Sequence, residues 1–367
     1  KNQMSVVESA RAVDEGTLEV TLNRPSNMWL YDMSSTAGMV FDSQAGVDFA
    51  TETAGSGPYL LSEWVPGSAV TLAINPNYWG TPGRFEQVVF RYFTDSEAMN
   101  AAMLAGELDI ISDLASPAAL PQFSDPARFR VIEGTTNGEV VLAMNNKAPG
   151  LSDVRVRQAI RSAIDKQALV NAVWGGKGAL IGAMVPPTDP WFEDRTGDFP
   201  YDPARAKALL AEAGAQNLRL RLRVPTLPYA TAAAQVVQTQ LRAVGIETDI
   251  DELEFPDQWN TTVRTNGDYD LSIMAHVEPR DLVRFADPND YFHYDSSEFA
   301  RLVREADEGT PADQVPKLQQ AARLMSQDAA ADWLFLLPNL VITKPNITGV
   351  PKNATTLSFD LTTIAAA

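Results

Sequence analysis

Side chains that could bind a charged solute gather in the stretch LSIMAHVEPRDLVRF, residues 271–285. Within six residues it carries His276, Glu278, Arg280 and Asp281. A carboxylate can hold an ammonium group, and a guanidinium can hold a carboxylate through two parallel hydrogen bonds. The same charges could instead pair with one another and only shape a loop, because paired surface charges are common and individually weak. The stretch is therefore suited to recognising charge, with an internal salt bridge as the equal alternative.

Metal ligation is a second chemistry that this stretch could support. The chain has two histidines, His276 and His293, seventeen residues apart, and neither has a second ligand at helical spacing. Cysteine is absent, which removes disulfides, thiolate nucleophiles and cysteine-based zinc sites. The sequence thus predicts no cofactor and no metal site built by the protein itself. Contact between one histidine and a metal that arrives already chelated stays open.

Motifs of covalent catalysis are missing from the sequence. No GxSxG elbow, HExxH pair, Walker loop or GxGxxG turn precedes a suitable helix. A carboxylate-dependent hydrolase needs two acidic residues that flank the scissile bond. With 47 acidic residues in the chain, such pairs can always be found, so their presence carries no weight. The sequence predicts a protein that is not an enzyme and has no catalytic residues.

Length and composition set further limits. A chain of 367 residues exceeds what one hydrophobic core usually organises, so two lobes are expected. The formal charge of −18 argues against nucleic acid as a partner and against docking on an anionic membrane. No apolar run reaches the 18 residues of a membrane span. The first residues lack the pattern of a secretory signal, so any export signal is expected to have been removed or to lie upstream.

Strand-like and helix-like patterns alternate along the chain and would position these residues. The predicted strands are 17–25, two runs within 55–80, 87–93, 139–146, 218–224, 246–253, 271–277 and 332–343. The predicted helices are 96–110, 152–178, 201–214, 231–245 and two between 297 and 328. The proline-rich stretch from Gly182 to Pro203 predicts a long irregular loop. This order of elements predicts a mixed α/β protein.

Several segments resemble family 5 extracellular solute-binding proteins, the peptide, nickel and oligopeptide class of ABC-importer receptors. GSGPYLLSEWVPGSAVTLAINPNYWG, residues 55–80, is similar to that family's signature at nearly every position. Within it, Tyr78 and Trp79 are expected to be packing anchors rather than ligand contacts. Further similar pieces follow in the family's order: AMLAGELDI (102–110), MNNKAPGLSDVRVRQAIRSAIDKQALV (144–170), YDPARAKALLAEAG (201–214) and VVQTQLRAVGI (236–246).

The resemblance implies a two-lobed, periplasmic-binding-protein-like α/β fold of type II, the peptide-binding class. Lobe I would hold residues 1–142 and 343–367, and lobe II would hold residues 143–342. The signature segment of such receptors lies well past the first hundred residues, but here it begins at Gly55. The resemblance therefore also implies that the chain is truncated at its N-terminus and that lobe I is incomplete.

The function that the resemblance implies is that of the substrate-binding component of an ABC importer. Such a receptor encloses a di- or oligopeptide-like solute between its lobes and delivers it to the permease complex, its partner. Binding of a metal chelate or an oligosaccharide by the same scaffold is the alternative, and a sensory role or a hydrolase are more distant ones. The implied protein is an extracytoplasmic monomer, and its membrane association would come only from the permease or from a lipid anchor on the full-length protein.

Candidate ligand-binding residues follow from their location in that family. In peptide-binding relatives, the strand and loop after the last β/α unit of the second lobe carry the acid that binds the ligand's amine. The corresponding stretch here is 271–285, so Glu278 or Asp281 is expected to bind an ammonium group and Arg280 a carboxylate. His276 lies beside them.

Two more candidates lie outside that stretch. Trp174 is followed by two glycines at a helix end that often faces the ligand in relatives, although a place in the core is equally compatible with its sequence. Asn145 belongs to the first of the two expected crossovers between the lobes, Leu142 to Asn146. The second crossover is expected at Asn339 to Thr343.

Overall fold

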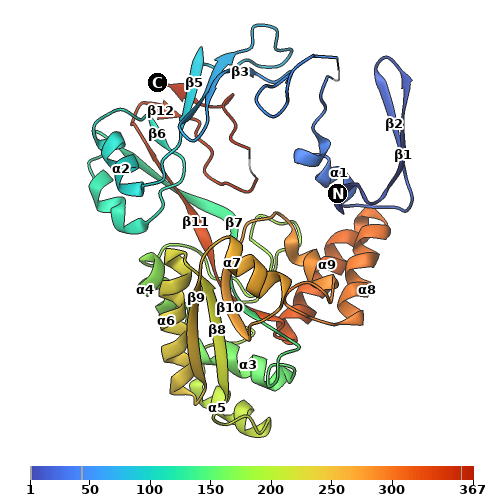
Figure 1. The fold of residues 1–367 in the computed structure, drawn as a ribbon, viewed down its shortest axis with the longest axis vertical. Coiled ribbons are helices and arrows are strands. Elements are labelled where there is room, and N and C mark those ends of the chain that lie inside the picture. The colour runs from blue at the N-terminus through green and yellow to red at the C-terminus, as the bar shows by residue number, and fades with distance from the viewer. Residues whose placement is uncertain (1, 43, 357) are drawn as a thin grey trace. The chain divides into compact units, whose positions relative to one another are not determined.

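The structure, a computed structural model, describes residues 2–42, 44–356 and 358–367. The chain divides into two compact units, shown in Figure 1. Unit 1 comprises Lys1–Gly38 and Thr136–Leu337, and unit 2 comprises Met39–Thr135 and Pro338–Ala367. The lobe bounds predicted from the sequence differ from these units chiefly at residues 1–38. The sequence assigns them to lobe I, whereas their contacts assign them to unit 1 with the middle of the chain.

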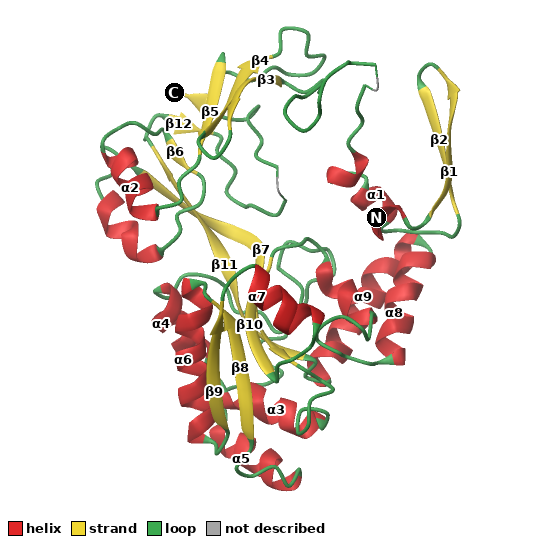
Figure 2. Ribbon diagram, in the orientation of Figure 1, coloured by secondary structure: helices red, strands yellow, loops and turns green. Residues whose placement is uncertain are grey.

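Unit 1 is built around a sheet whose strands follow the order β11-β7-β10-β8-β9. The strands are β7 (Arg130–Met144), β8 (Arg219–Pro225), β9 (Glu247–Leu253), β10 (Leu271–His276) and β11 (Ala331–Thr343). β8 runs parallel to both β9 and β10, and β10 runs antiparallel to β7. Figure 2 shows these strands in yellow with helices beside them. The mixed α/β architecture predicted from the sequence is confirmed.

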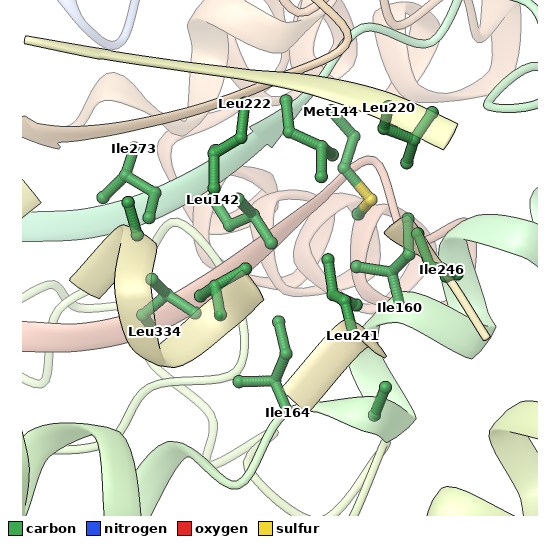
Figure 3. Close-up of a cluster of buried hydrophobic side chains, with 14 of the residues drawn as sticks. Leu142, Met144, Ile160, Ile164, Leu220, Leu222, Leu241, Ile246, Ile273 and Leu334 are labelled. Carbon is green, nitrogen blue, oxygen red and sulfur yellow. The ribbon is translucent and has the colours of Figure 1, made fainter. Parts of the chain in front are cut away.

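Strands β7, β10 and β11 are covered on both faces, which explains why their buried stretches are apolar almost without interruption, whereas β8 and β9 alternate between mostly apolar buried residues and more exposed charged residues. Side chains alternate between faces along a strand. In β7, Val140 and Leu142 accordingly join one buried cluster, and Val141 and Ala143 join another. Figure 3 shows the first cluster, in which Leu142 packs with residues of neighbouring strands and helices. The strongly apolar run EVVLAMNN therefore forms the central strand of unit 1.

The predicted helix over residues 152–178 is wrong as a single element. The structure has α3 (Val154–Ala163) and α4 (Lys166–Trp174). Asp165 causes the break, because its side chain accepts a hydrogen bond from the backbone N–H of Ala168 and so caps a new helix start. The expected cap Asp153 does begin α3 in the same way. Gly175, in the left-handed conformation, ends α4.

Further helices surround the sheet of unit 1, and α6 packs on β8 and β9. They are α5 (Pro203–Glu212), α6 (Pro228–Ala243), α7 (Asp257–Trp259), α8 (Ser297–Glu308) and α9 (Pro311–Gln327), with a 3-10 helix at Asp281–Ala286. The amino-terminal segment adds β1 (Val7–Asp14), β2 (Thr17–Leu22) and α1 (Trp29–Asp32). The sequence predicted β2 but not its hairpin partner β1. The proline-rich stretch before α5 forms the irregular loop that was predicted.

Unit 2 contains the predicted hairpin and third strand as an antiparallel sheet, β3 (Tyr59–Val65), β4 (Ala69–Ile74) and β5 (Gln87–Arg91). It also holds α2 (Ser96–Leu104), β6 (Ile110–Ile111), which pairs with the end of β11, and the short pair β12 (Ile347–Thr348) and β13 (Ala365–Ala366). Trp79 is 85% exposed, so the expectation that it anchors packing is wrong.

Among the described residues, no helix combines the length and apolar character needed to cross a membrane.

Candidate ligand-binding site

Unit 1 contains a cavity of about 680 Å³, a size that suits a small solute. Its lining comes from the amino-terminal segment, from the loop after β10 and from α8 and α9. Glu278, Arg280 and Asp281 all line it. The structure therefore brings three of the sequence-predicted site residues to one cavity, and His276 lies directly behind them at the end of β10.

Arg280 is held flat between two aromatic rings. Its Cζ atom lies 3.5 Å from the ring centroid of Tyr31 and 5.1 Å from that of Trp191. Such stacking orients a guanidinium, and Nη1 of Arg280 donates a long, weak hydrogen bond to Met28 Sδ at 4.0 Å. Among the residues that the structure describes, no carboxylate forms an ion pair with Arg280. The backbone of Arg280 is left-handed, with φ of 59°, an uncommon conformation for a residue other than glycine.

Tyr31 reaches this position because the segment before it is tied to the end of α8. Asp307 forms an ion pair with Arg24. Its Oδ1 atom accepts hydrogen bonds from Ser26 Oγ at 2.8 Å and from the backbone N–H of Met28 at 3.0 Å. Three donors on one carboxylate fix the entry to α1. The amino-terminal segment thereby contributes a wall and a stacking partner to the cavity.

His276 is buried and neutral. Arg284 Nη1, which can only donate, lies 3.1 Å from Nδ1 of His276, so Nδ1 is the acceptor and carries no proton. The proton is therefore on Nε2, which donates to Tyr291 Oη at 2.7 Å. Burial, together with the charges of Arg284 and Arg264, lowers the pKa of His276 to about 3.

Asp281 lies next to this histidine with its charge poorly compensated. Its Oδ2 atom is 3.9 Å from His276 Nδ1, and the residue is only 4% exposed. Neither carboxylate oxygen accepts a hydrogen bond from any described residue. Burial raises the pKa of Asp281 well above its ordinary value, although the nearby Arg284 opposes the shift. Glu278, by contrast, is 56% exposed at its side chain and lies 3.9 Å from Arg284.

One potential ligand atom from each of His276, Glu278 and Asp281 lies within 4.8 Å of the others. Imidazole and carboxylate are a donor set that suits divalent transition metals. However, Arg284 Nη1 donates to the same nitrogen of His276 that would bind the metal. A metal would therefore have to displace a guanidinium. The sequence predicts no metal site built by the protein. Among the described residues, this cluster is where a metal-binding experiment would test that prediction.

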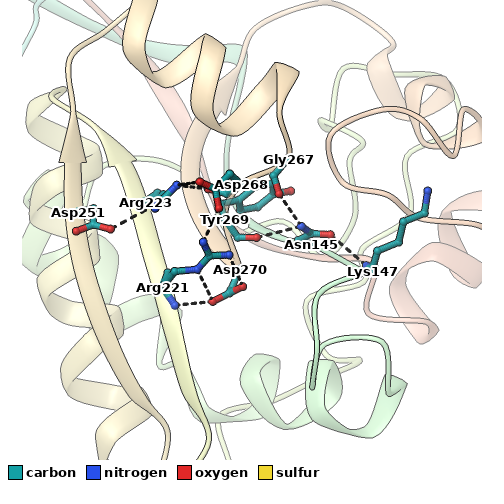
Figure 4. A network of polar contacts seen from close by, with 9 residues as sticks. All are labelled: Asn145, Lys147, Arg221, Arg223, Asp251, Gly267, Asp268, Tyr269 and Asp270. Carbon is teal, nitrogen blue, oxygen red and sulfur yellow. Dashed lines mark hydrogen bonds and ion pairs between the residues drawn. The ribbon is translucent and has the colours of Figure 1, made fainter.

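Trp174 and Asn145 do not line the cavity. Figure 4 shows that Asn145 belongs to a different polar network. Its Nδ2 donates to the carbonyls of Gly267 and Tyr269 at 3.1 and 3.0 Å, and its Oδ1 accepts from the backbone N–H of Lys147. Trp174 is half-buried against the first core cluster. A ligand-binding role for these two residues stays a prediction.

The sequence analysis missed four residues that adjoin the predicted site residues without lining the cavity themselves. Glu139 lies at the start of the apolar part of β7 and is 1% exposed. A charged residue directly before the apolar run VVLAMNN could have indicated a buried functional carboxylate. Asp189, in the proline-rich loop, has its pKa raised to about 6 by burial, although Arg280 opposes the shift. Tyr31 and Trp191 gave no signal, because their role depends on Arg280, which is distant in sequence.

The chain is similar to proteins that bind solutes. The family described as "Bacterial extracellular solute-binding proteins, family 5 Middle" matches residues 1–296. Di/tripeptide-binding protein 4 of Pseudomonas aeruginosa (strain UCBPP-PA14) is 28% identical over 359 residues, which cover 90% of this chain. The match covers 66% of that relative, so the chain spans about two thirds of its length.

Solved structures share the fold. AppA from Clostridium difficile superposes with a TM-score of 0.87 at 17% identity, covering all of this chain and 81% of that one. NikA from Brucella suis in complex with Fe(III)-EDTA gives a TM-score of 0.84 at 20% identity, covering 100% and 80%. The predicted type II periplasmic-binding fold is confirmed by this likeness. Since the family match extends over most of the sequence, the chain belongs to family 5 of the bacterial extracellular solute-binding proteins.

Proposed function

We propose that the chain is the solute-binding part of an ABC importer and that it binds a di- or oligopeptide-like solute without converting it. The names of its relatives support this proposal, since they include di/tripeptide-, dipeptide- and D,D-dipeptide-binding proteins. The partner of such a protein is the permease complex, and its place is outside the cytoplasm. Relatives named as periplasmic proteins support that location.

One observation carries the peptide assignment. Arg280, which has no ion pair with a described carboxylate, lines the same cavity as Asp281, whose two oxygens have no described hydrogen-bond donor. A free peptide carries one carboxylate and one ammonium group, which are the two charges that this pair of residues lacks. We assign the carboxylate to Arg280 and the ammonium to Asp281 and the neighbouring Glu278.

The balance of charge favours a peptide over an anionic chelate such as the one in the NikA complex. Six carboxylates and four guanidiniums line the cavity. The carboxylates are Asp32, Glu278, Asp281, Asp287, Asp290 and Asp307. An acidic lining repels a multiply negative chelate. Among the described lining residues there is no aromatic side chain that could stack on a sugar ring, so an oligosaccharide is also disfavoured.

Native mass spectrometry of the purified chain, followed by thermal-shift measurements with a peptide panel, tests the proposal. We expect a peptide to co-purify or to raise the melting temperature, and we expect incubation to leave the peptide intact. Stabilisation by a metal chelate or a sugar, with no response to any peptide, would show that the ligand class is wrong. Cleavage of the peptide would show that the chain is an enzyme.

Variants of the acidic residues test the site assignment. Glu278→Ala combined with Asp281→Ala should abolish binding that depends on the peptide's free amine, because no carboxylate then faces the ammonium. Glu252→Ala is the matched control, since Glu252 is an exposed carboxylate on β9 outside the cavity. Unchanged affinity in the double variant would rule out these residues.

A further inference from the structure

Two buried carboxyl groups lie beside the cavity, Glu139 on β7 and Asp281 at the start of the 3-10 helix that follows β10. β7 pairs with β10 so that Glu139 lies directly opposite His276. Directly opposed residues of antiparallel strands project to the same face of the sheet, with Cβ atoms about 5 Å apart. Asp281 Oδ2 lies 3.9 Å from His276 Nδ1. Glu139 and Asp281 therefore both lie next to one imidazole, and Asp281 is one of the residues that line the cavity.

At this corner beside the cavity, the buried oxygens of these two carboxyl groups lack close donors. Glu139 Oε2 and both oxygens of Asp281 are buried and accept no hydrogen bond from any described residue. The nearest guanidinium, Arg284, is already engaged, because its Nη2 donates to Asp290 at 3.1 Å and its Nη1 donates to His276. Asp189 adds another buried oxygen without a described donor. A buried carboxylate without a partner is costly, so the corner is complementary to a cation from outside.

We propose that Glu139 and Asp281 form a subsite for a second cationic group of the solute, an ammonium on a lysine-type side chain, so that the chain prefers basic peptides. This inference rests on the proposed function. For a basic peptide this divides the assignment made above: Glu278, at the exposed side of the cavity, takes the α-ammonium, and Asp281 takes the side-chain ammonium. An ammonium donates three hydrogen bonds and can satisfy both buried carboxyl groups. A neutral side chain of the same length would leave both unpaired, and sites built for a polar partner reject analogues that lack it.

A metal ion is the competing cation for this corner, but the observed contacts favour an ammonium. A metal at His276, Glu278 and Asp281 must displace Arg284 from Nδ1 of His276. An ammonium bound by the carboxyl groups needs no ligand atom from His276, so that hydrogen bond can stay. Burial raises the pKa values of both groups, with the charge of Asp281 adding to the shift of Glu139 and the charges of Glu278 and Asp189 adding to that of Asp281, which fits carboxyl groups that ionise only when a cation arrives.

Calorimetric titration of the full chain with lysyl-alanine and norleucyl-alanine tests the proposal, because the two peptides differ only by the side-chain ammonium. We expect lysyl-alanine to bind about 30-fold more tightly, the scale of charge-assisted hydrogen bonds. Glu139→Gln should bring the ratio of the two dissociation constants close to 1. Glu252→Gln, the same change on an exposed face of β9, should keep the ratio.

Each other outcome overturns a different statement. Equal binding of both peptides to the unmodified chain would refute the subsite and leave the peptide assignment standing. Glu139→Gln that weakens both peptides and keeps their ratio would show a purely structural role. If Zn²⁺ alone binds, and His276→Gln removes that binding while the peptides remain equivalent, the corner is a metal site.

If neither peptide binds, the proposed function is wrong. The subsite is then tested separately with 1,5-diaminopentane, a small diamine that carries the same ammonium group, by comparing the melting temperatures of the unmodified chain and of Glu139→Gln. Thermal stabilisation of the unmodified chain but not of Glu139→Gln would support the subsite. Equal responses of the two proteins would refute it.

Discussion

Unit 1 contains two groups of acidic residues, and they differ in how their charge is balanced. On β8 and β9 and the turn before β10, the carboxylates alternate with guanidiniums and have close partners, as Figure 4 shows for most of them. The pairs are Arg219–Asp249 at 2.6 Å, Arg221–Asp270 at 3.0 Å and Arg223–Asp268 at 2.7 Å. Hydrogen bonds from Arg223 and Arg221 lower the pKa of Asp268. We call these pairs the matched network.

Near the end of β10, in contrast, buried carboxyl groups lack partners. Glu139 and Asp281 are more deeply buried than the matched network, yet Oε2 of Glu139 and both carboxylate oxygens of Asp281 have no described donor, and both pKa values are raised. The comparison teaches that burial alone does not mark structural ion pairs. The matched network is complete within the chain, whereas the carboxyl groups near β10 are complementary to something that the chain does not supply. Opposite responses to mutation are therefore expected in the two regions.

The largest effect is expected when the matched network is broken at its most buried carboxylate. Asp270 Oδ2 accepts from the backbone N–H of Arg221 at 2.8 Å and from its Nε at 3.1 Å. Asp270→Ala should lower the free energy of unfolding by about 3 kcal/mol, since it leaves a half-buried guanidinium and a backbone donor without their partner. Urea denaturation measures this. A loss as small as that of Asp249→Ala, at a more exposed carboxylate of the network, would contradict the account.

Removing charge from the unmatched corner should have the opposite sign. The raised pKa of Glu139 means that its contribution to stability is complete below about pH 4 and is lost as the pH rises through its folded-state value. Glu139→Gln should therefore raise the free energy of unfolding at pH 8 by about 2 kcal/mol and change it little at pH 4. Denaturation of the solute-free chain at both pH values checks this, and a loss of stability at pH 8 would contradict it.

Asp189 offers a smaller effect with a defined pH range. Burial raises its pKa from 3.8 to about 6, so its stabilising contribution disappears between pH 4 and pH 6. Asp189→Asn should gain about 1 kcal/mol at pH 7.5 relative to pH 4, less than the full shift implies because the residue is only half-buried. Thermal melts across this range measure the difference. A gain that does not depend on pH would show that ionisation is not its cause.

The smallest effect is expected at the solvent-facing end of the matched network. The pair between Arg219 and Asp249 is exposed at both side chains, and water screens such pairs. Arg219→Gln should leave the melting temperature unchanged within error. A loss of stability comparable to that of Asp270→Ala would mean that solvent exposure does not determine how much each ion pair of the network contributes.

The sequence predicted much of the scaffold because local patterns determine it. The hairpin around Gly67, the cap at Asp153 and the apolar strand after Glu139 follow from turn chemistry, capping and hydrophobic periodicity. The helix break at Asp165 was missed because the apolar pattern continues through it. Its capping side chain was visible only as one polar residue among others.

The candidate site was predictable only where its residues are adjacent in sequence. Glu278, Arg280 and Asp281 could be proposed from one charged stretch, and the structure brings them to one cavity. Their partners could not be proposed. Tyr31 lies some 250 positions from Arg280 along the chain, and Glu139 meets His276 only through strand pairing. Contacts of this kind depend on tertiary structure, for which a single sequence carries no local signal.

The most direct test of peptide binding at this cavity is calorimetric titration of the full chain with lysyl-alanine and with its N-acetylated and C-amidated forms. The account predicts that the free peptide binds and that each blocked form binds at least about tenfold more weakly, because each loses one charge-assisted contact. The amide should be weakened through Arg280 and the acetyl form through Glu278. Equal affinity for all three peptides, or no binding of any of them, would contradict the account.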